Sequence, residues 1–385
     1  MRLALTPAQE ALKAELRAYL SALADEVERD TSGESRYTLA IRRMGHDGWL
    51  GLGWPKEYGG QARGPVDQMI FAEEAHWAGV PLPLLTLGSV APALMSLGTD
   101  DQKRDLLPKI LAGELHFAIG YTEPNAGTDL ASLQTKAVRD GDEWVIDGQK
   151  IFTSAIQHAD YVWLAVRTDP EAPKHKGLSV ILVPTSAPGF HWAPLYTMAG
   201  EFTSATFYED VHVPISNLVG EENHGWKLIT NQLNHERVAL CPASGTLRSL
   251  AEVRRWAQDT NLADGRRVID QDWVRLTFAR IAARGEFLKL MNWKVAWAAE
   301  KGLNPADASA TKVFGTEFTL EAYRLLMEVV GQSSYLEAGS TGAVLAARLE
   351  REYRAQTIFT FGGGTNEIQR DLIAMIGLGM PRAPR

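Results

Sequence analysis

The hydrophobic pattern of the chain changes period twice, and this constrains the fold more than any other feature. Apolar positions recur at helical spacing up to about residue 117, broken by a loop at Gly51 to Gly64 and a turn at Pro81 to Pro83. Helical spacing returns from about Gly225 to the end. Helices, then strands, then helices predict an α+β protein with three domains, at residues 1–117, 118–223 and 224–385.

The middle region has the composition of strands. Four short runs are aromatic or β-branched: Trp144–Ile146, Ile151–Thr153, Tyr161–Val166 and Leu178–Val183. The segments between them carry turn dipeptides: Asp140-Gly141, Asp147-Gly148 and Pro188-Gly189. This alternation predicts an antiparallel sheet or barrel.

Composition excludes several kinds of partner. The 385 residues are 45% hydrophobic with a net charge of −8, which supports a large core and argues against nucleic acid. The single cysteine, Cys241, rules out a disulfide within the chain and fits a reducing cytoplasm. Thr6, Pro7 and Gln9 predict a capped helix at the N-terminus, and no apolar run reaches the roughly 18 residues that would cross a membrane.

Glu236 interrupts an apolar helical stripe. Spacings of three and four residues join Trp226, Ile229, Leu233, Glu236 and Leu240. A buried carboxylate costs several kcal/mol unless it is paired or protonated, and burial raises its pKa toward values useful to a general base. The alternatives are an ion pair with Arg237 or a side chain turned to solvent. Pro242 should kink this helix just beyond Glu236.

Several familiar chemistries lack their motifs. His235 and Glu236 begin an HExxH-like string, but Ala239 stands at its fifth position, so the zinc-protease pattern fails and no metal site is expected. The dinucleotide, P-loop and serine hydrolase motifs are also missing from the sequence.

Two polar strings with glycines remain. They are YTEPNAGTD at 121–129 and FGGGTNEIQR at 361–370. In the second, three glycines would let a ligand approach the backbone, and Thr365 is a candidate N-cap for a helix from Ile368 to Leu378. An ordinary loop that enters a terminal helix is the alternative.

Four motifs give the chain a resemblance to the acyl-CoA dehydrogenase family over its whole length. They are GWPKEYGG at 53–60, YTEPNAGTD at 121–129, GQKIFTS at 148–154 and GGGTNEIQR at 362–370. The resemblance implies an N-terminal helical domain, a central β-barrel-like domain and a C-terminal four-helix bundle. It also implies FAD bound between the β domain and the bundle.

The same motifs imply the residues that contact the cofactor. The loop at 121–129 would contact the flavin, the pyrophosphate and the thioester, and the strand in GQKIFTS would lie against the isoalloxazine ring, with Phe152 on the ring and Ser154 near N5. The C-terminal loop would meet the cofactor as well. The implied cofactor-binding residues are Tyr121, Thr122, Gly127, Thr128, Phe152, Ser154, Thr365 and Glu367.

The family's catalytic base occupies one of two sites. Many members carry glutamate just before the Gly-Thr of the last motif, where this chain has Gly363. Others carry it on the helix after the β domain beside an arginine, which matches Asn234-His235-Glu236-Arg237. Glu236 is therefore the implied base. The implied substrate-binding residues are Thr128, Asn234, Arg237 and Gly363.

The implied reaction converts an acyl-CoA to a trans-2-enoyl-CoA. Glu236 removes the α-proton, the β-hydrogen leaves as hydride to FAD, and the Gly363 amide stabilises the enolate oxygen. An electron-transfer flavoprotein is the implied acceptor. The alternatives are a general fatty or branched-chain acyl-CoA dehydrogenase, a flavin oxidase or oxygenase on the same fold, and a non-catalytic scaffold subunit.

Two strings depart from the family pattern. Family subunits usually lend a neighbour's FAD an R-x-x-F-G string and a Gln-x-x-Gly-Gly string, whereas the chain has ADGRRVI at 263–269 and EVVGQ at 328–332. Its own FAD motifs are intact. This asymmetry is similar to α-subunits of actinobacterial dehydrogenases that act on steroid (cholesterol) side chains. It implies an α2β2 heterotetramer with a homologous partner, with a homotetramer as the alternative.

Overall fold

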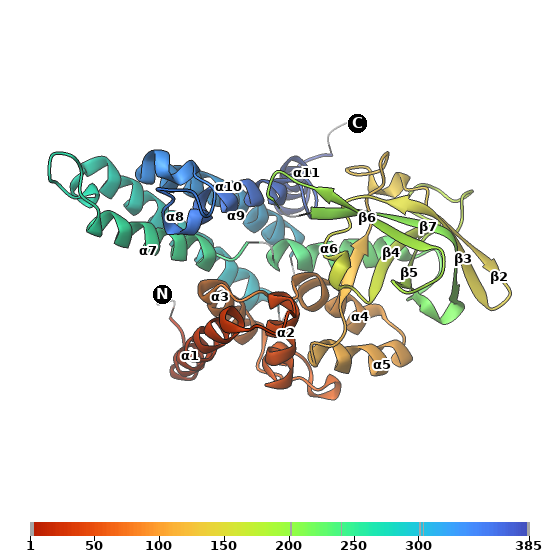
Figure 1. The fold of residues 1–385 in the computed structure, drawn as a ribbon. Helices are drawn as coiled ribbons and strands as arrows, with labels where there is room; N and C mark the ends of the chain where they lie inside the picture. Colours follow the sequence, from red (N-terminus) through yellow and green to blue (C-terminus); the bar gives the residue numbers. More distant parts are fainter. Residues whose placement is uncertain (1–3, 201, 240, 300–301, 303, 383–385) are drawn as a thin grey trace.

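The chain folds as three successive groups of elements: helices, a sheet and a helical bundle (Figure 1). The computed structural model describes residues 4–200, 202–239, 241–299, 302 and 304–382, and for residues 234–239 it describes the backbone only. The prediction of an α+β fold in this order is confirmed. The limits at residues 117 and 223 stay our proposed division.

Helices of the N-terminal group form one layer below the other two groups in the view of Figure 1. Thr6 caps the first helix in a capping box: its hydroxyl accepts from the Gln9 amide at 3.3 Å, and the Gln9 side chain accepts from the Thr6 amide at 3.0 Å. The predicted N-terminal cap is thus confirmed. The helices are α1 (Pro7–Arg29), α2 (Arg36–His46), α3 (Pro65–Ala78), α4 (Ala91–Leu97) and α5 (Asp100–Leu111).

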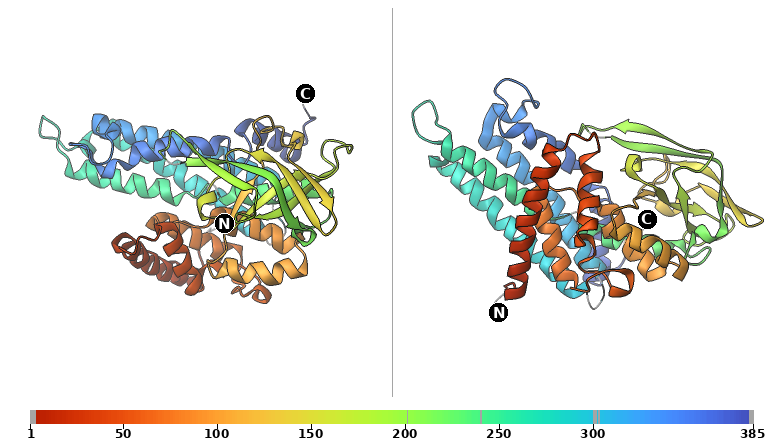
Figure 2. Two further views of the ribbon diagram at one scale, coloured as in Figure 1. Left: turned by 45° about the vertical axis from the view of Figure 1, so that its right-hand side comes forward. Right: turned by 60° about the horizontal axis from the view of Figure 1, so that its bottom comes forward.

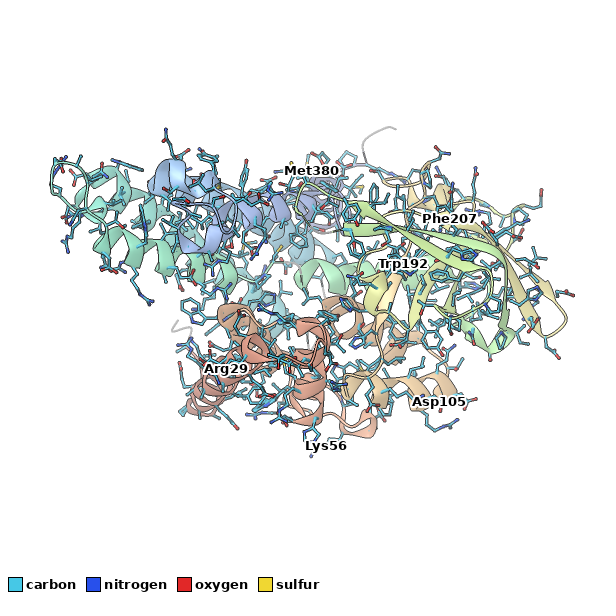
Figure 3. All side chains as sticks on the ribbon, in the orientation of Figure 1. Arg29, Lys56, Asp105, Trp192, Phe207 and Met380 are labelled. Atoms are coloured by element: carbon cyan, nitrogen blue, oxygen red, sulfur yellow. The ribbon has the colours of Figure 1, made fainter. Side chains whose placement is uncertain are left out.

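The sheet is mixed. Its strands are β1 (Phe117–Gly120), β2 (Lys136–Asp140), β3 (Glu143–Lys150), β4 (Tyr161–Arg167), β5 (Leu178–Pro184), β6 (Phe190–Tyr196), β7 (Phe202–Pro214) and β8 (Leu218–Val219). They follow the order β6-β7-β3-β2-β4-β5-β8, and β1 pairs with β4 in parallel. Trp192 of the edge strand β6, labelled in Figure 3, stacks on Phe202. Its side chain is 41% exposed.

Strand β4 is buried on both faces, which explains its unbroken apolar sequence. Val162 and Leu164 join the core on one face of the sheet. Trp163 and Ala165 join a second core, which the sheet shares with the N-terminal helices and with Ile229 of the helix that follows the sheet. A strand with two buried faces shows no alternation of polar and apolar residues.

Two expectations for strand β3 were wrong. The run Ile151–Thr153 lies beyond the end of β3, because Phe152 adopts a left-handed φ of 63°. Asp147-Gly148 lies inside the strand at a register shift against β7, where a Cβ on Gly148 would stand 2.6 Å from the Thr135 hydroxyl. Asp140-Gly141 does lie at the turn that joins β2 to β3, as predicted.

The third group is the bundle, seen from two further directions in Figure 2. Its helices are α6 (Gly225–Ala239), α7 (Ser244–Asp259), α8 (Asp272–Ala298), α9 (Pro305–Val330), α10 (Arg348–Gln356) and α11 (Asn366–Leu372). The expected kink at Pro242 is wrong, because Pro242 lies outside both helices, between the end of α6 and the start of α7. Proline lacks the donor that a continuing helix needs.

Hydrogen bonds join the start of α7 in the bundle to helix α3 of the N-terminal group. The Glu73 carboxylate of α3 accepts from the amides of Ala243 and Ser244 at 3.3 and 3.1 Å, at the start of α7. Burial raises the pKa of Glu73, although these amides and Lys289 oppose the rise.

None of the described helices combines the length and apolar character needed to cross a membrane.

Candidate functional site

Strand β1 leads directly into the first motif, whose opening residue is anchored in the sheet. Tyr121 is buried, its hydroxyl accepts from Trp163 Nε1 at 2.9 Å, and its carbonyl oxygen accepts from Lys150 Nζ at 3.1 Å. Thr122 is half-buried, while Gly127 and Thr128 are exposed. The loop therefore has a fixed base and an accessible end.

A buried ion pair joins the first motif to the second. Lys150 Nζ lies 2.9 Å from Glu123 Oε1, and both side chains are buried. The Glu123 carboxylate also accepts from the amides of Gln134 and Thr135, at 2.7 and 2.8 Å. These three donors meet the requirement that a buried charge be paired and hydrogen-bonded.

The two charges of this pair shift each other's pKa. Burial lowers the pKa of Lys150 to about 8, and the charge of Glu123 limits the fall. For Glu123, burial favours a higher pKa, but the charge and hydrogen bond of Lys150 outweigh it and lower the pKa below its ordinary value. The Glu123 carboxylate is therefore ionised at neutral pH.

The second motif displays an aromatic ring on a strained backbone. Phe152 has a φ of 63° and is 58% exposed, although large apolar side chains are usually buried. The peptides on either side are held by bonds from the Ile151 amide to the Thr122 carbonyl at 2.8 Å and from the Thr153 amide to the Ser204 carbonyl at 2.9 Å. A rigidly held, exposed ring suits contact with a planar cofactor such as a flavin.

Ser154 follows on the same segment. Its hydroxyl lies 3.1 Å from the Thr203 hydroxyl of β7, and the next residue, Ala155, again has a left-handed φ of 60°. Two left-handed residues other than glycine within four positions indicate a backbone determined by its surroundings. The segment 151–155 therefore presents Phe152 and Ser154 in one defined geometry.

Helix α6 carries the sequence position expected for the base. Within it, Ile229 and Gln232 are buried, and Gln232 Nε2 donates to the hydroxyl of Ser89, which lies in a π-helical turn at Thr86–Val90. Helix geometry places position 236 one turn beyond Gln232. The side chains of Asn234, Glu236 and Arg237 lie outside the described residues.

The last motif forms a tight glycine loop that ends at a helix cap. Gly363 and Gly364 have φ values of 67° and 93°, a conformation that other L-residues rarely adopt. Thr365 is the N-cap of α11, as predicted, and its hydroxyl accepts from the Ile368 amide at 3.3 Å. Glu367 is exposed in the first turn of this helix.

A buried lysine of α9 supports this loop. Lys312 is fully buried, and its Nζ donates to the carbonyl oxygens of Thr360 at 3.1 Å and Gly364 at 2.7 Å and to Asn366 Oδ1 at 2.8 Å. Asn366 in turn donates to the Thr316 hydroxyl at 3.1 Å. The glycine loop is thus fastened to α9.

The structure sorts the expected residues into two groups. Tyr121, Thr122, Phe152 and Ser154 belong to one bonded unit of the β domain, through the Ile151–Thr122 bond and the Glu123–Lys150 pair. Gly363 and Thr365 belong to a second unit built on α9. Within the described part of the chain, no three His, Cys, Asp or Glu side chains gather as metal ligands would.

Sequence reasoning missed the three charged residues that build these units: Glu123, Lys150 and Lys312. A signal was present for Lys312, which is the only charged residue between Asp307 and Glu317. Glu236 gave a different signal, a charge at an apolar position of a helical stripe. Lys150 gave a weaker signal, since polar residues are common near strand ends.

Family models match all three parts of the chain. They describe the N-terminal domain of acyl-CoA dehydrogenase at residues 6–114, its middle domain at 118–211 and its C-terminal domain at 223–378. The chain is 58% identical to acyl-CoA dehydrogenase FadE26 of Mycobacterium tuberculosis over 400 residues, covering 100% of each chain. It is 50% identical to FadE29 of the same organism, over 99% of each.

Solved structures agree with this assignment. The ChsE4-ChsE5 complex from Mycobacterium tuberculosis contains a chain 59% identical, with a TM-score of 0.93 and 100% of each chain covered. A chain of the Tcur3481-Tcur3483 steroid ACAD is 50% identical, with a TM-score of 0.92 over 100% of each chain. The protein therefore belongs to the acyl-CoA dehydrogenase family of oxidoreductases.

Proposed function

We propose that the chain oxidises an acyl-CoA with a bulky, steroid side-chain acyl group to its trans-2-enoyl-CoA, with FAD as cofactor and Glu236 as base. The observation that carries the choice of base is the φ of 67° at Gly363. A glutamate at this position would have to adopt a left-handed backbone, which costs roughly 1–2 kcal/mol. Glycine fits the turn, and the carboxylate is supplied from α6.

The residues present fit FAD, which supplies the acceptor for the β-hydrogen when it is bound. Phe152 and Ser154 would contact the flavin ring, Tyr121, Thr122, Gly127 and Thr128 would hold the cofactor from the first motif, and Thr365 and Glu367 would hold it from the last. The rigid segment 151–155 and the exposed Phe152 ring support this assignment.

On the substrate side, Glu236 would accept the α-proton. The Gly363 amide would donate to the thioester oxygen, where negative charge develops as the proton leaves. Asn234, Arg237 and Thr128 would orient the thioester and the base. The steroid side-chain assignment rests on the high identity to chains of solved complexes, one of which is described as a steroid ACAD.

Two observations support a homologous partner subunit. Both close structural relatives were solved as complexes of two different proteins. In addition, the arginines that could serve a neighbour's FAD are engaged locally: Arg266 pairs with Asp264 at 2.7 Å, and Arg267 pairs with Asp270 at 2.9 Å. The FAD of this chain would then be contacted by residues of the partner subunit, while this chain would contribute few contacts to the FAD of its partner.

An exposed stripe on α8 offers a surface for that partner. Residues at heptad-like spacings leave large apolar side chains in solvent: Trp273 at 47%, Leu276 at 71%, Phe287 at 51%, Leu290 at 46% and Trp297 at 69%. Side chains three or four residues apart share one helix face, and a face of this kind suits packing against another helix.

Anaerobic flavin reduction tests the proposal. The chain, alone and co-expressed with a homologous partner, is mixed with straight-chain, branched and steroid-bearing acyl-CoA thioesters. We expect rapid loss of oxidised-flavin absorbance with the steroid thioester, and persistence of reduced flavin in air until an electron-transfer flavoprotein is added. Rapid reoxidation by air alone would indicate an oxidase. Absence of reduction by every thioester would overturn the dehydrogenase assignment.

A further inference from the structure

Lys312 of α9 contacts more than the neighbouring helix, because it also binds the loop that contains the glycine run Gly362–Gly364. On α9, Ser309, Lys312 and Thr316 lie three and four residues apart and therefore share one face. Ser309 donates to Gln369 at 2.9 Å and Thr316 bonds to Asn366, so both connect α9 to α11, which lies beside it (Figure 1). Lys312 also reaches past α11 into the loop that precedes it.

The two carbonyl groups that Lys312 binds lie at opposite ends of this loop. Thr360 immediately precedes the segment Phe361–Gly363, and Gly364 follows it. A run of glycines loses more conformational entropy on ordering than any other sequence, and two of these glycines have left-handed φ values. A cation that binds both ends confines the run between them to one conformation.

The burial of Lys312 gives an energetic reason for its bonds to the loop. Its side chain is fully buried, and removing an ammonium group from water costs several kcal/mol unless nearby groups compensate. The bonds to the loop carbonyls supply part of this compensation. A purely structural tie between α9 and α11 would not need them, since Ser309 and Thr316 already connect the two helices with uncharged groups.

We infer that Lys312 is a positioning residue, which holds the glycine run so that the Gly363 amide faces the thioester oxygen of the substrate. This inference rests on the proposed function, in which Gly363 makes that contact. Lys312 acts through the loop, and its bond to the Gly364 carbonyl also polarises the following peptide, whose amide belongs to Thr365.

The test compares two ligands that differ only at the carbonyl group. The FAD-loaded protein is titrated calorimetrically with a trans-2-enoyl-CoA, which is a product and does not reduce the flavin, and with the matching thioether, in which a methylene replaces the carbonyl. Lys312→Met removes the charge and the donors with little change in length. Lys312→Gln keeps an uncharged donor. Ser309→Ala is the control, because it removes a bond between α9 and α11 outside the loop.

We expect wild type and Ser309→Ala to prefer the thioester. Lys312→Met should lose roughly tenfold of this preference, as expected for one hydrogen bond to the carbonyl, with thioether affinity unchanged. Lys312→Gln should show a thioester preference between those of wild type and Lys312→Met. If Lys312→Met does not accumulate with bound FAD, the loss of preference is measured on Lys312→Gln instead. Equal losses for both ligands, or an unchanged preference, would overturn the inference.

Failure of the inference and of the proposed function give different results. A wild-type protein that reduces its flavin with acyl-CoA but shows no thioester preference overturns the inference and leaves the function standing. A wild-type protein whose flavin no acyl-CoA reduces overturns the function, and the inference with it.

Discussion

The two halves of the site are each organised by a buried lysine, but the lysines meet different partners. In the β domain, Lys150 at the end of β3 pairs with the Glu123 carboxylate and donates to the Tyr121 carbonyl, so it joins β3 to the loop that follows β1. In the bundle, Lys312 meets carbonyl oxygens and the Asn366 amide oxygen and joins a helix to a glycine loop. Lys150 is bound by a carboxylate and by one backbone carbonyl, whereas Lys312 binds two carbonyl groups four residues apart and so fixes the course of the backbone between them.

This difference matches what each half is proposed to do. The β-domain half would present side chains, Phe152 and Ser154, to a cofactor. The bundle half would present a backbone amide, that of Gly363, to a substrate. A side chain keeps a defined orientation when the strand end that carries it is rigid. A backbone amide keeps a defined orientation only when the loop that contains it is held in place. The predictions below test this division, beginning with the largest expected effect.

Glu236→Gln should separate chemistry from binding most strongly. An amide of nearly the same shape cannot accept the α-proton, so flavin reduction should slow by roughly 10²–10⁴-fold while FAD content stays normal. Stopped-flow reduction with the preferred acyl-CoA and the flavin absorbance of the purified protein provide the two measurements. Near-normal reduction would remove Glu236 from the role of base.

Lys150→Met should damage the β-domain half through stability. It leaves the Glu123 carboxylate buried without its cation, and the loss of one partner of a buried pair costs roughly 3–5 kcal/mol. The double variant Glu123→Gln with Lys150→Met should recover much of this loss, because no uncompensated charge remains. Urea denaturation at saturating FAD measures both, and a double variant no more stable than Lys150→Met would contradict the account.

The same pair should make stability depend on pH in the acid range. The pKa of Glu123 is lowered in the folded protein, so below about pH 4.5, its ordinary value, the unfolded chain binds more protons. The contribution of Glu123 is therefore present above that pH and is lost as the pH falls through the folded value. The stability advantage of wild type over the double variant should shrink as the pH drops below about 4.5, and an advantage independent of pH would refute this.

Much of the fold follows from the sequence, because its main signals are local. The capping box at Thr6, the turn at Asp140-Gly141 and the N-cap at Thr365 depend on neighbouring residues only, and all three are confirmed. The strand expected at Ile151–Thr153 is wrong because contacts from Thr122 and Ser204 hold Phe152 in a left-handed backbone. Such contacts cannot be read from the run itself.

The site was predictable only where a motif carried it. The roles proposed for Tyr121, Phe152 and Thr365 came from the family resemblance and stay predictions. Lys150 and Lys312 act through burial and through partners 27 and 48 residues distant in sequence, which spacing and composition do not reveal.

Gly363→Ala should weaken the bundle half moderately. The φ of 67° becomes strained with a Cβ, at roughly 1–2 kcal/mol, which lowers the melting temperature. Gly245→Ala is the matched control, because Gly245 lies in α7 with open space around its missing Cβ and alanine favours helix. It should stabilise the protein slightly. Equal effects of the two changes would mean that backbone conformation at Gly363 does not matter.

Ser154→Ala should have the smallest effect. The hydroxyl lies 3.1 Å from that of Thr203, and the loss of one hydrogen bond near the flavin is worth about 1 kcal/mol, or about fivefold in the rate of flavin reduction. Thr203→Val removes the same hydrogen bond while it keeps the Ser154 hydroxyl. If the two variants reduce flavin equally slowly, Ser154 acts through Thr203 and not through the cofactor.

The loop between α7 and α8 has an electrostatic consequence for assembly. Between residues 263 and 271 the two acids, Asp264 and Asp270, balance the two bases, Arg266 and Arg267, so the formal charge of this segment is zero. Each arginine forms an ion pair with an acid of the same loop. Long-range attraction between proteins requires unbalanced charge and weakens as added salt shortens the Debye length. A subunit that approaches this loop is therefore not steered by it, and the contribution of the loop to the association rate should stay constant from low to high ionic strength.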